Sequence, residues 1–477
     1  MDYSDLKNRW FEHYRTSEEQ LTKMRDVKGL ISAFNANIDA VIKIQGKTIE
    51  EIISKHKINT HELLSDDKTV INSNTDAVRG LVKCFKGGIA EEWLIENVDV
   101  FYWLDKTIGY DKMQMGGQGG IVANVMAVCG VNPVYVHTAS SPKEQSELFL
   151  NLPNLQNVDE SGVLKKAHDI SRSNDIPLIH WIIEFNKGDT INIAGQKFTC
   201  PKSNRFIATY DPLNFKLAID DSFSKKMSNP ETGYEYIILS GYQMLKQSLP
   251  DGSPGTDRIE ASKKIISKWR KNNPDVILHL EIASTQDKTI RKYLIDHLAR
   301  EVDSIGFNER ELIDILEVIG EEQLAAVCEE KTNSSNLFKG MLKIFDYVNC
   351  PRMQLHMFGL YITLQKPGFK ITPLQNRKGM QLAANVAASK AGTGAINTKE
   401  VLLWSKNQKV SDTGLNELQD LSATVNRLFG SNNLMEEGMF SNNQIEIIAV
   451  PTIIIDNPVT LVGMGDTISS VSLVGAR

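Results

Sequence analysis

Apolar runs typical of strands alternate with amphipathic spans typical of helices along most of the chain. The runs are rich in β-branched residues and include LISAF, PVYVH, EYIILS, DVILHLEI and IEIIAV, which begin at Leu30, Pro133, Glu235, Asp275 and Ile445. Helix-like spans such as GIVANVMAVCG and RIEASKKIISKWRKN lie between them. Because parallel strands are joined by long crossover connections, this alternation predicts an α/β fold with a mainly parallel central sheet and helices on both faces.

Two stretches of the chain break this alternation. The segment from about Lys43 to Lys112 is polar and fits the sheet poorly, whereas HWIIEFNKGDTINIAGQKFTC, from His180 to Cys200, alternates at period two between glycine turns. The second pattern is typical of an antiparallel meander. We therefore expect a large αβα domain and a smaller β-rich domain inserted in two pieces. The expected ranges are 1–40, 113–165 and 216–477 for the large domain, and 41–112 and 166–215 for the small one.

The composition indicates a globular protein that acts on small molecules. Hydrophobic residues make up 41% of the chain and charged residues 23%, and the net charge of −6 comes without a long basic run, which argues against nucleic-acid binding. The five cysteines are scattered without a C-x-x-C pair, so we expect neither disulfides nor a thiolate metal site. No segment approaches the ~18 uninterrupted apolar residues of a membrane span. We expect a cytoplasmic monomer or small homo-oligomer without nucleic-acid or membrane partners.

The stretch LVGMGDTISS, from Leu461 to Ser470, has the pattern of a strand-to-helix turn. Gly463 and Gly465 allow close approach of the backbone to a ligand, and the unpaired N–H groups at a helix start attract anions. Asp466 then has two interpretations. It is either a simple N-cap, or a base that removes a proton from a hydroxyl while the glycine N–H groups hold a phosphoryl group. The motif alone leaves both open.

Polar groups also follow the first strand and precede an apolar helix. AFNANIDAV places Asn37 and Asp39 where they could hydrogen-bond a polyol, although an Asx-rich turn explains the same residues. QMGGQGG brings Gly116 and Gly117 to the start of a helix-like span. This is not G-x-G-x-x-G, and we expect no strand to lead directly into it, so a dinucleotide site is disfavoured.

Two acids follow later strands. LHLEIAS leaves Glu281 at a strand end, and GFNERELIDIL puts Glu311 in the first turn of a helix. Oxygen ligands of this kind suit Mg²⁺, which keeps waters and binds few carboxylates together with substrate phosphates. A first-turn acid that is favoured by the helix dipole explains Glu311 equally well. His279 has no second histidine nearby, so zinc is disfavoured.

Taken together and in this order, these motifs resemble the ADP-dependent sugar kinases of archaea, a branch of the ribokinase-like superfamily. The set comprises the N-x-D after the first strand, the glycine pair, H-x-E, N-x-x-E and the C-terminal G-x-G-D, and it spans about residues 30–470. The resemblance implies a large αβα sandwich with a smaller β-rich lid. It also implies transfer of the β-phosphate of ADP to glucose or to fructose 6-phosphate, with AMP as the second product.

The resemblance assigns roles to the motif residues. Asp466 resembles the catalytic base, Gly463 and Gly465 its anion hole, and Glu281 and Glu311 the acids that hold Mg²⁺, or another divalent cation, through its waters. Sugar contacts are implied for Asn37, Asp39, Gly116 and Gly117, and nucleotide contacts for Gly463, Met464, Gly465 and His356.

Arg205, in NRFIATYD, is similar to the arginine that reaches the nucleotide phosphates from the lid. A guanidinium can hold phosphate oxygens in pairs and stays charged while negative charge develops on the transferring group. We therefore expect Arg205 to serve both nucleotide binding and catalysis.

Four residues bear on the choice of sugar. Glu91 resembles the lid glutamate that accepts hydrogen bonds from glucose, and His180 resembles the glucose-contacting histidine of the glucokinases. Asp211 stands where phosphofructokinases carry an arginine, and we expect its carboxylate to repel a sugar phosphate. Lys187 is similar to a lysine found where that phosphate docks. We favour an ADP-dependent glucokinase, with a phosphofructokinase or a bifunctional enzyme as the alternative.

Two further hypotheses come from other classes of protein. One is a sugar- or nucleotide-binding protein without the chemistry, which retention of Asp466 disfavours, and the other is an NAD-dependent oxidoreductase. The sequence also departs from the family in one respect. Only eleven residues follow Asp466, so we expect the helix of the G-x-G-D motif to be short, with a less rigid anion hole.

Overall fold

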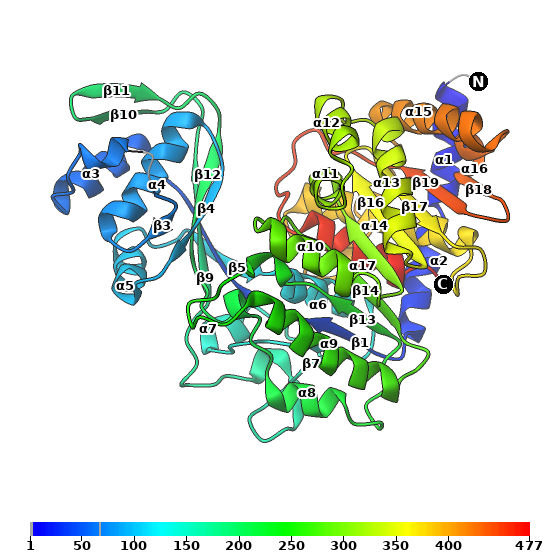
Figure 1. Cartoon of the computed structure of the whole chain (residues 1–477), viewed down its shortest axis with the longest axis horizontal. Coiled ribbons are helices and arrows are strands. Elements are labelled where there is room, and N and C mark those ends of the chain that lie inside the picture. The colour runs from blue at the N-terminus through cyan, green and yellow to red at the C-terminus, as the bar shows by residue number, and fades with distance from the viewer. Residues whose placement is uncertain (1–2, 66–67) are drawn as a thin grey trace.

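An eleven-stranded sheet runs through the larger part of the molecule (Figure 1). The computed structural model describes residues 3–65 and 68–477. In spatial order the strands are β18 (Met439–Ser441), β19 (Glu446–Pro451), β17 (Leu360–Gln365), β16 (Arg352–Met357), β15 (Ser304–Phe307), β14 (Ile277–Glu281), β13 (Tyr236–Leu239), β1 (Leu30–Ala33), β6 (Val134–Val136), β7 (Leu155–Val158) and β8 (Leu164–Lys166). All pairings from β16 to β7 are parallel, and the strands outside them pair antiparallel. The expected mainly parallel sheet is confirmed.

Helices cover both faces of this sheet. One layer contains α6 (Gln118–Cys129), α14 (Pro373–Thr393) and α17 (Met464–Val474), with α1 (Tyr3–Tyr14) and α2 (Ser17–Lys23) packed on α14. The other contains α11 (Glu309–Val318), α13 (Ser334–Val348) and α15 (Asp412–Phe429), flanked by α8 (Asp221–Met227), α9 (Gly255–Asn272), α10 (Lys288–His297), α12 (Glu322–Glu330) and α16 (Leu434–Glu437). The short α7 (Lys143–Ser146) follows β6. The result is an αβα sandwich.

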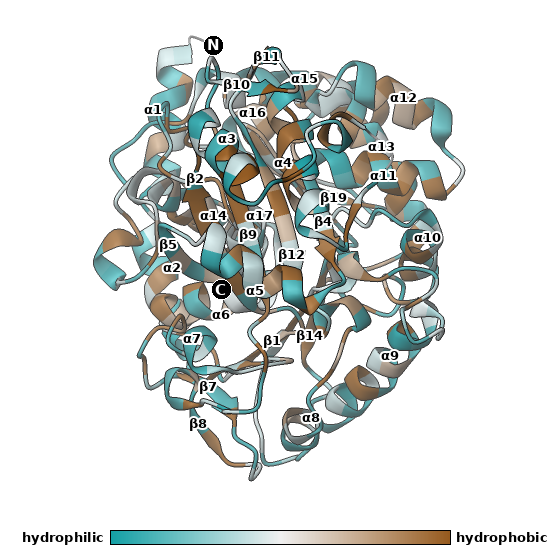
Figure 2. Ribbon diagram, turned by 90° about the vertical axis from the view of Figure 1, so that its left-hand side faces the viewer, coloured by the Kyte–Doolittle hydropathy of each residue, from teal (hydrophilic) through white to brown (hydrophobic). Residues whose placement is uncertain are grey.

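A second, six-stranded sheet forms the lid, which stands apart from the sandwich in Figure 1. Its order is β3 (Val70–Ile71), β4 (Glu91–Ile95), β12 (Asn204–Tyr210), β9 (Ile179–Phe185), β2 (Asn37–Lys43) and β5 (Lys112–Gly116). The helices α3 (Gly46–Lys55), α4 (Asn74–Gly87) and α5 (Val98–Thr107) cover one face, and β10 (Thr190–Ile193) and β11 (Gln196–Thr199) form a separate hairpin. Seen from the lid side, apolar stretches of its strands lie behind these helices (Figure 2).

The buried apolar side chains form two separate cores, one in the sandwich and one in the lid. The lid core draws on residues between Ile38 and Leu104 and between Ile179 and Ala208. Ala167, which lies in the range expected for the lid, is buried in the core of the sandwich. Alternation in the lid strands sends every second side chain into the lid core and the others toward the sandwich. The other face of the lid is therefore available to a ligand between the domains.

The C-terminal helix is better packed than its length suggests. α17 runs for 11 residues, and every residue from Asp466 to Val474 is buried, mostly against α14 and α6. We expected a less rigid start of this helix, and the close packing argues against that expectation. In the described ranges 3–65 and 68–477, no helix combines the length and apolarity needed to cross a membrane.

Candidate active site

The G-x-G-D motif forms the start of α17. Gly463 is the N-cap residue with φ of 62°, a left-handed conformation that glycine adopts without strain. A Cβ on Gly463 would lie 2.6 Å from Ile121 Cδ1, and one on Gly465 would lie 2.8 Å from His356 Nε2. Gly463 is thus favoured by its positive φ, and Gly465 by the close His356 ring. Their backbone N–H groups belong to the helix terminus, which leaves them suited to bind an anion.

Asp466 lies in the first turn of α17 and does not cap it. Gly463 occupies the N-cap position without a side-chain cap, so the interpretation of Asp466 as a simple N-cap is wrong. The carboxyl group is buried, which raises its pKa, while Lys390 and a hydrogen bond from Gln118 lower it in part. A buried carboxylate beside helix N–H groups has the arrangement that proton removal from a hydroxyl requires.

Two more buried acids, Glu281 and Glu311, face the same region. Burial, followed by the charge of Glu311, raises the pKa of Glu281 well above its ordinary value, and Asp466 adds to this. Burial raises the pKa of Glu311 to about 8, to which Asp466 also contributes. The three carboxyl groups are therefore close enough to repel one another.

Each of these two acids is also held in place by neighbours. His279 Nε2 lies 3.1 Å from Glu281 Oε2, and its Nδ1 lies 2.9 Å from Ser304 Oγ. Glu311 accepts a 2.8 Å hydrogen bond from the Asn308 backbone N–H in a capping box, so its structural role at the helix start is present as well. Within the described part of the chain, no three His, Cys, Asp or Glu side chains are placed to hold a metal on their own. A cation here would need water or phosphate oxygens as further ligands.

Asn37 and Asp39 lie at the start of β2, where the chain enters the lid sheet. Asn37 Nδ2 donates to Asp39 Oδ1 at 3.0 Å, while the buried Asn37 Oδ1 accepts no hydrogen bond from the described residues. A Cβ on Gly116 would lie 2.2 Å from Asp39 Oδ1, and one on Gly117 would lie 2.7 Å from Asn37 Oδ1. The glycine pair thus makes room for these polar side chains. Contrary to our expectation, β5 leads directly into this glycine pair.

His180 of β9 stands opposite Asp39 in the lid sheet. Its Nε2 lies 3.1 Å from Asp211 Oδ2, and its Nδ1 lies 3.8 Å from Glu92 Oε1. Burial alone would lower the pKa of His180, but the hydrogen bond to Asp211 and the charges of Glu92, Asp211 and Asp39 raise it to about 9. The imidazole is therefore held in its protonated form beside Asp39.

Glu91 does not join this group, which corrects the sequence assignment by one residue. Glu91 Oε2 accepts a 2.7 Å hydrogen bond from Trp93 Nε1, and its Oε1 lies 3.0 Å from Lys83 Nζ on α4. It shares the face of β4 that is turned to the lid core. Glu92 points the other way and accepts a 2.6 Å hydrogen bond from Thr209, so Glu92 is the acid beside His180.

Asp211 and Lys187, which bear on the choice of sugar, lie elsewhere than expected. The Asp211 side chain is fully buried, and it accepts hydrogen bonds from His180 and Asn214 and does not face the cleft. Lys187 follows the distal end of β9, seven residues from His180, which is roughly 23 Å along an extended strand. Asp211 therefore acts by fixing His180, and Lys187 is remote from the group around it.

Arg205, His356 and Met464, which we expected to contact the nucleotide, lie in three different parts of the structure. Arg205 is exposed on β12 of the lid, on the same strand face as Thr209. His356 is buried under the start of α17, with Nε2 3.7 Å from Glu281 Oε1, and burial lowers its pKa to about 4. Met464 is partly buried against the sandwich core. Of these three residues, Arg205 is the one that lies on the lid.

Lys390, which the sequence analysis did not single out, completes the site. Its Nζ donates to Gly463 O at 2.9 Å and to Thr467 Oγ1 at 3.2 Å. Burial lowers the pKa of Lys390 to about 8, and the charges of Asp466 and Asp39 oppose this decrease. The sequence around Lys390, AASKAGTG, gives little indication that this residue is buried in the site, because an isolated lysine near a helix end is usually solvated.

Known proteins of one family match this chain over nearly its whole length. The model of the ADP-specific phosphofructokinase/glucokinase conserved region matches residues 28–475. The ADP-dependent glucose/glucosamine kinase of Pyrococcus furiosus is 30% identical over 475 residues, which cover 98% of each chain. The ADP-specific phosphofructokinase of Methanosarcina acetivorans is 27% identical over 480 residues, covering 98% of this chain and 96% of that protein.

Solved structures give the same result. The structure of the last common ancestor of ADP-dependent phosphofructokinases from Methanosarcinales covers 100% of this chain and 99% of its own, with a TM-score of 0.86 and 30% identity. The structure of an ADP-dependent kinase in complex with fructose 6-phosphate and ADPβS covers 100% of this chain and 98% of its own. Its TM-score is 0.82 and its sequence identity is 29%. The protein is an ADP-dependent sugar kinase, and the chain belongs to the ADP-specific phosphofructokinase/glucokinase family.

Proposed function

We propose that this kinase is an ADP-dependent glucokinase, which transfers the β-phosphate of ADP to the 6-hydroxyl of D-glucose and yields AMP and glucose 6-phosphate. The observation that carries the proposal is the charge of the group formed by Asp39, Glu92, His180 and Asp211. In the described part of the chain, these three carboxylates form no ion pair with an arginine or lysine. His180 lies within 4 Å of Glu92 and Asp211 and pairs with Asp39 in the register of the neighbouring strand. Such a group suits the hydroxyls of a neutral sugar.

The orphaned acceptor of Asn37 supports the same proposal. A buried carbonyl oxygen without a partner loses about 1–3 kcal/mol of hydrogen-bond energy, which a sugar hydroxyl would restore. Asp39 and Glu92 add carboxylate acceptors, and the protonated His180 adds a donor. A polyol with several neighbouring hydroxyls satisfies both kinds of group.

Fructose 6-phosphate is the alternative acceptor, with a bifunctional enzyme between the two. Most of the similar curated proteins are named ADP-specific phosphofructokinases, and one of the similar structures contains fructose 6-phosphate. A dianionic phosphate needs basic partners. His180 is a single cation that already faces three carboxylates, and Lys187 lies at the far end of β9, so the charges favour glucose.

In the proposed mechanism Asp466 removes the proton of the 6-hydroxyl as that oxygen attacks phosphorus. The N–H groups of Gly463 and Gly465 and the dipole of α17 stabilise the developing negative charge. Arg205 approaches the phosphates when the lid closes and helps exclude water. The lid also brings His180 and Glu92 over the sugar.

The acids Glu281 and Glu311 fit a divalent cation such as Mg²⁺. Their raised pKa values reflect burial and mutual repulsion with Asp466, which a cation would relieve. When bound, Mg²⁺ would neutralise phosphate oxygens. Glu281 and Glu311 would orient its waters, and His279 would keep Glu281 in position.

The test is AMP release from ADP and Mg²⁺ with glucose, with fructose 6-phosphate, and with ATP replacing ADP as the control. The proposal expects AMP with glucose and a much lower kcat/KM with fructose 6-phosphate. Equal efficiencies would indicate a bifunctional enzyme, and AMP formed only with fructose 6-phosphate would refute the glucokinase assignment. Glu92→Gln serves as the matched variant, because it should reduce glucose use and leave ADP affinity unchanged.

A further inference from the structure

Lys390 is buried directly behind the turn that begins α17. Its Nζ donates to Gly463 O at 2.9 Å and to Thr467 Oγ1 at 3.2 Å, and the Thr467 hydroxyl donates to Gly463 O at 2.8 Å. The ammonium group thus ties the left-handed glycine to the first turn of the helix. Because α14 and α17 are packed along their lengths, this contact is held on both sides.

The same ammonium group lies in the electric field of two carboxylates from different elements. Asp466 on α17 and Asp39 on β2 both raise its affinity for a proton, yet neither forms an ion pair with it within 4 Å. Asp466 in turn faces Lys390 of α14, Glu281 of β14 and Glu311 of α11, while His356 of β16 lies under Gly465. In that surrounding of acids, Lys390 is the cation that lowers the pKa of Asp466.

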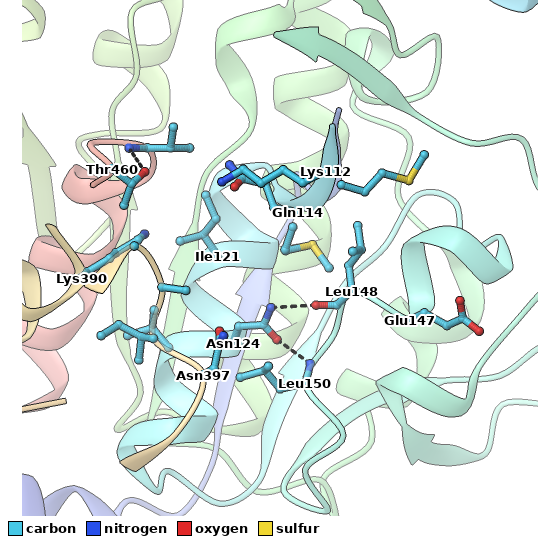
Figure 3. Close-up of a pocket in the computed structure, with 17 residues that line it drawn as sticks. Lys112, Gln114, Ile121, Asn124, Glu147, Leu148, Leu150, Lys390, Asn397 and Thr460 are labelled. Atoms are coloured by element: carbon cyan, nitrogen blue, oxygen red, sulfur yellow. Dashed lines mark hydrogen bonds between the residues drawn. The ribbon is translucent and has the colours of Figure 1, made fainter. Parts of the chain in front are cut away.

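A cavity of about 410 Å³ opens beside Lys390 (Figure 3). Its walls come from β5, α6 and the loops around Asn397 and Thr460, and Lys112 and Gln114 lie at one side. The amide of Asn124, which also lines it, is already paired with Leu148 O and Leu150 N. A small solute can therefore reach the position of the lysine.

We propose that Lys390 is a positioning residue for phosphoryl transfer, whose positive charge keeps Asp466 in its basic form and whose hydrogen bonds hold the anion-binding turn at Gly463. This inference rests on the proposed role of Asp466 as the base. Lys390 donates its hydrogen bonds to Gly463 O and Thr467 Oγ1 at the start of α17. It acts on the reaction through α17, and its charge is required more than its bulk.

The experiment compares Lys390→Ala, Lys390→Met and Lys390→Arg in the full-length enzyme. Lys390→Ala should lower kcat on the order of 10-fold or more with a smaller change in KM for ADP, since a buried cation beside a reacting carboxylate is lost. Ethylammonium should enter the cavity and restore part of this activity in a saturable manner. Ethanol, a neutral molecule of similar size, should not.

The other variants separate charge from packing. Lys390→Met fills the space without charge, so its activity should be low and insensitive to ethylammonium, and the acidic limb of its kcat profile should move up by about one pH unit or more. Lys390→Arg should retain the acidic limb of the parent. Lys112→Ala, at the rim of the same cavity, should leave all these properties unchanged.

Several outcomes would overturn the inference. They are parental kcat in Lys390→Met, an unshifted acidic limb in that variant, or restoration of Lys390→Ala by ethanol as well as by ethylammonium. If Lys390→Met does not fold, as judged by circular dichroism, a Lys390→Ala enzyme that no alkylammonium restores overturns the inference as well. A turnover rate of Asp466→Asn equal to that of the parent enzyme would instead refute the proposed role of Asp466 as the base. A low turnover rate of Asp466→Asn together with parental turnover rates of the Lys390 variants would refute only this inference.

Discussion

Replacing Asp211 with Asn should release His180 from its raised pKa. The shift of the His180 pKa from 6.5 to about 9 corresponds to about 3 kcal/mol of preference for the protonated ring. Asp211 is the fully buried partner at 3.1 Å, whereas the Glu92 side chain is 37% exposed and its charge is screened by solvent. Most of the stabilisation is therefore assigned to Asp211, and the His180 pKa should fall toward its ordinary value in Asp211→Asn.

The pH dependence follows from the direction of the shift. Because the pKa of His180 is raised in the folded protein, its contribution to stability is complete below pH 6.5 and is lost as pH rises through about 9. In the parent enzyme, the glucose KM should stay constant up to about pH 8 and rise above it. In Asp211→Asn the rise should begin near pH 6.5, as the histidine loses its proton there.

The assay is an NMR titration of ¹³C-labelled histidine rings, with His180→Asn used to identify the resonance of His180. Asp105→Asn, an exposed lid carboxylate on α5, is the control and should leave the titration unchanged. A parent His180 that titrates near 6.5 would refute the reasoning. So would an Asp211→Asn protein in which the midpoint stays near 9.

Three further predictions concern the reaction itself. Asp466→Asn should lower kcat by about 10²-fold or more, measured by AMP release, and leave ADP affinity nearly intact, measured by calorimetry. A kcat equal to that of the parent enzyme would exclude Asp466 as the base. Glu92→Ala should raise the glucose KM by roughly 10-fold or more, as expected for a lost charged hydrogen bond, and Glu91→Ala should change it little; the reverse ranking would restore Glu91 as the sugar contact. Glu311→Gln keeps the capping box and should raise the Mg²⁺ concentration needed for half-maximal rate, and an unchanged Mg²⁺ titration would remove Glu311 from the cation site.

The sequence predicted the elements of the sandwich and the place of Asp466 because both have local signals. Apolar runs such as EYIILS become central strands with every residue of Tyr236–Leu239 buried. The glycines of G-x-G-D are favoured by the positive φ of Gly463 and by the closeness of His356 to Gly465, and the pattern of the motif alone was sufficient to mark them.

Other parts of the site depend on register and burial, which a single sequence does not specify. A shift of one residue in β4 exchanges Glu91 for Glu92 and moves the carboxylate to the opposite face. From the sequence, Asp211 is expected to repel a sugar phosphate, whereas the fold buries its side chain beside His180. Lys390 lies more than seventy residues before Gly463, and only the packing of α14 on α17 joins them.

The lid sheet is assembled from distant parts of the chain, and this has a consequence for folding. Ile38 of β2 pairs with Ile179 of β9, and the residues between them include the neighbouring sandwich strands β6 and β7. Closing so long a loop costs conformational entropy before any lid contact is made. The sandwich should therefore fold first and hold the two segments in register, and the lid should gain protection from pulsed hydrogen exchange only afterwards.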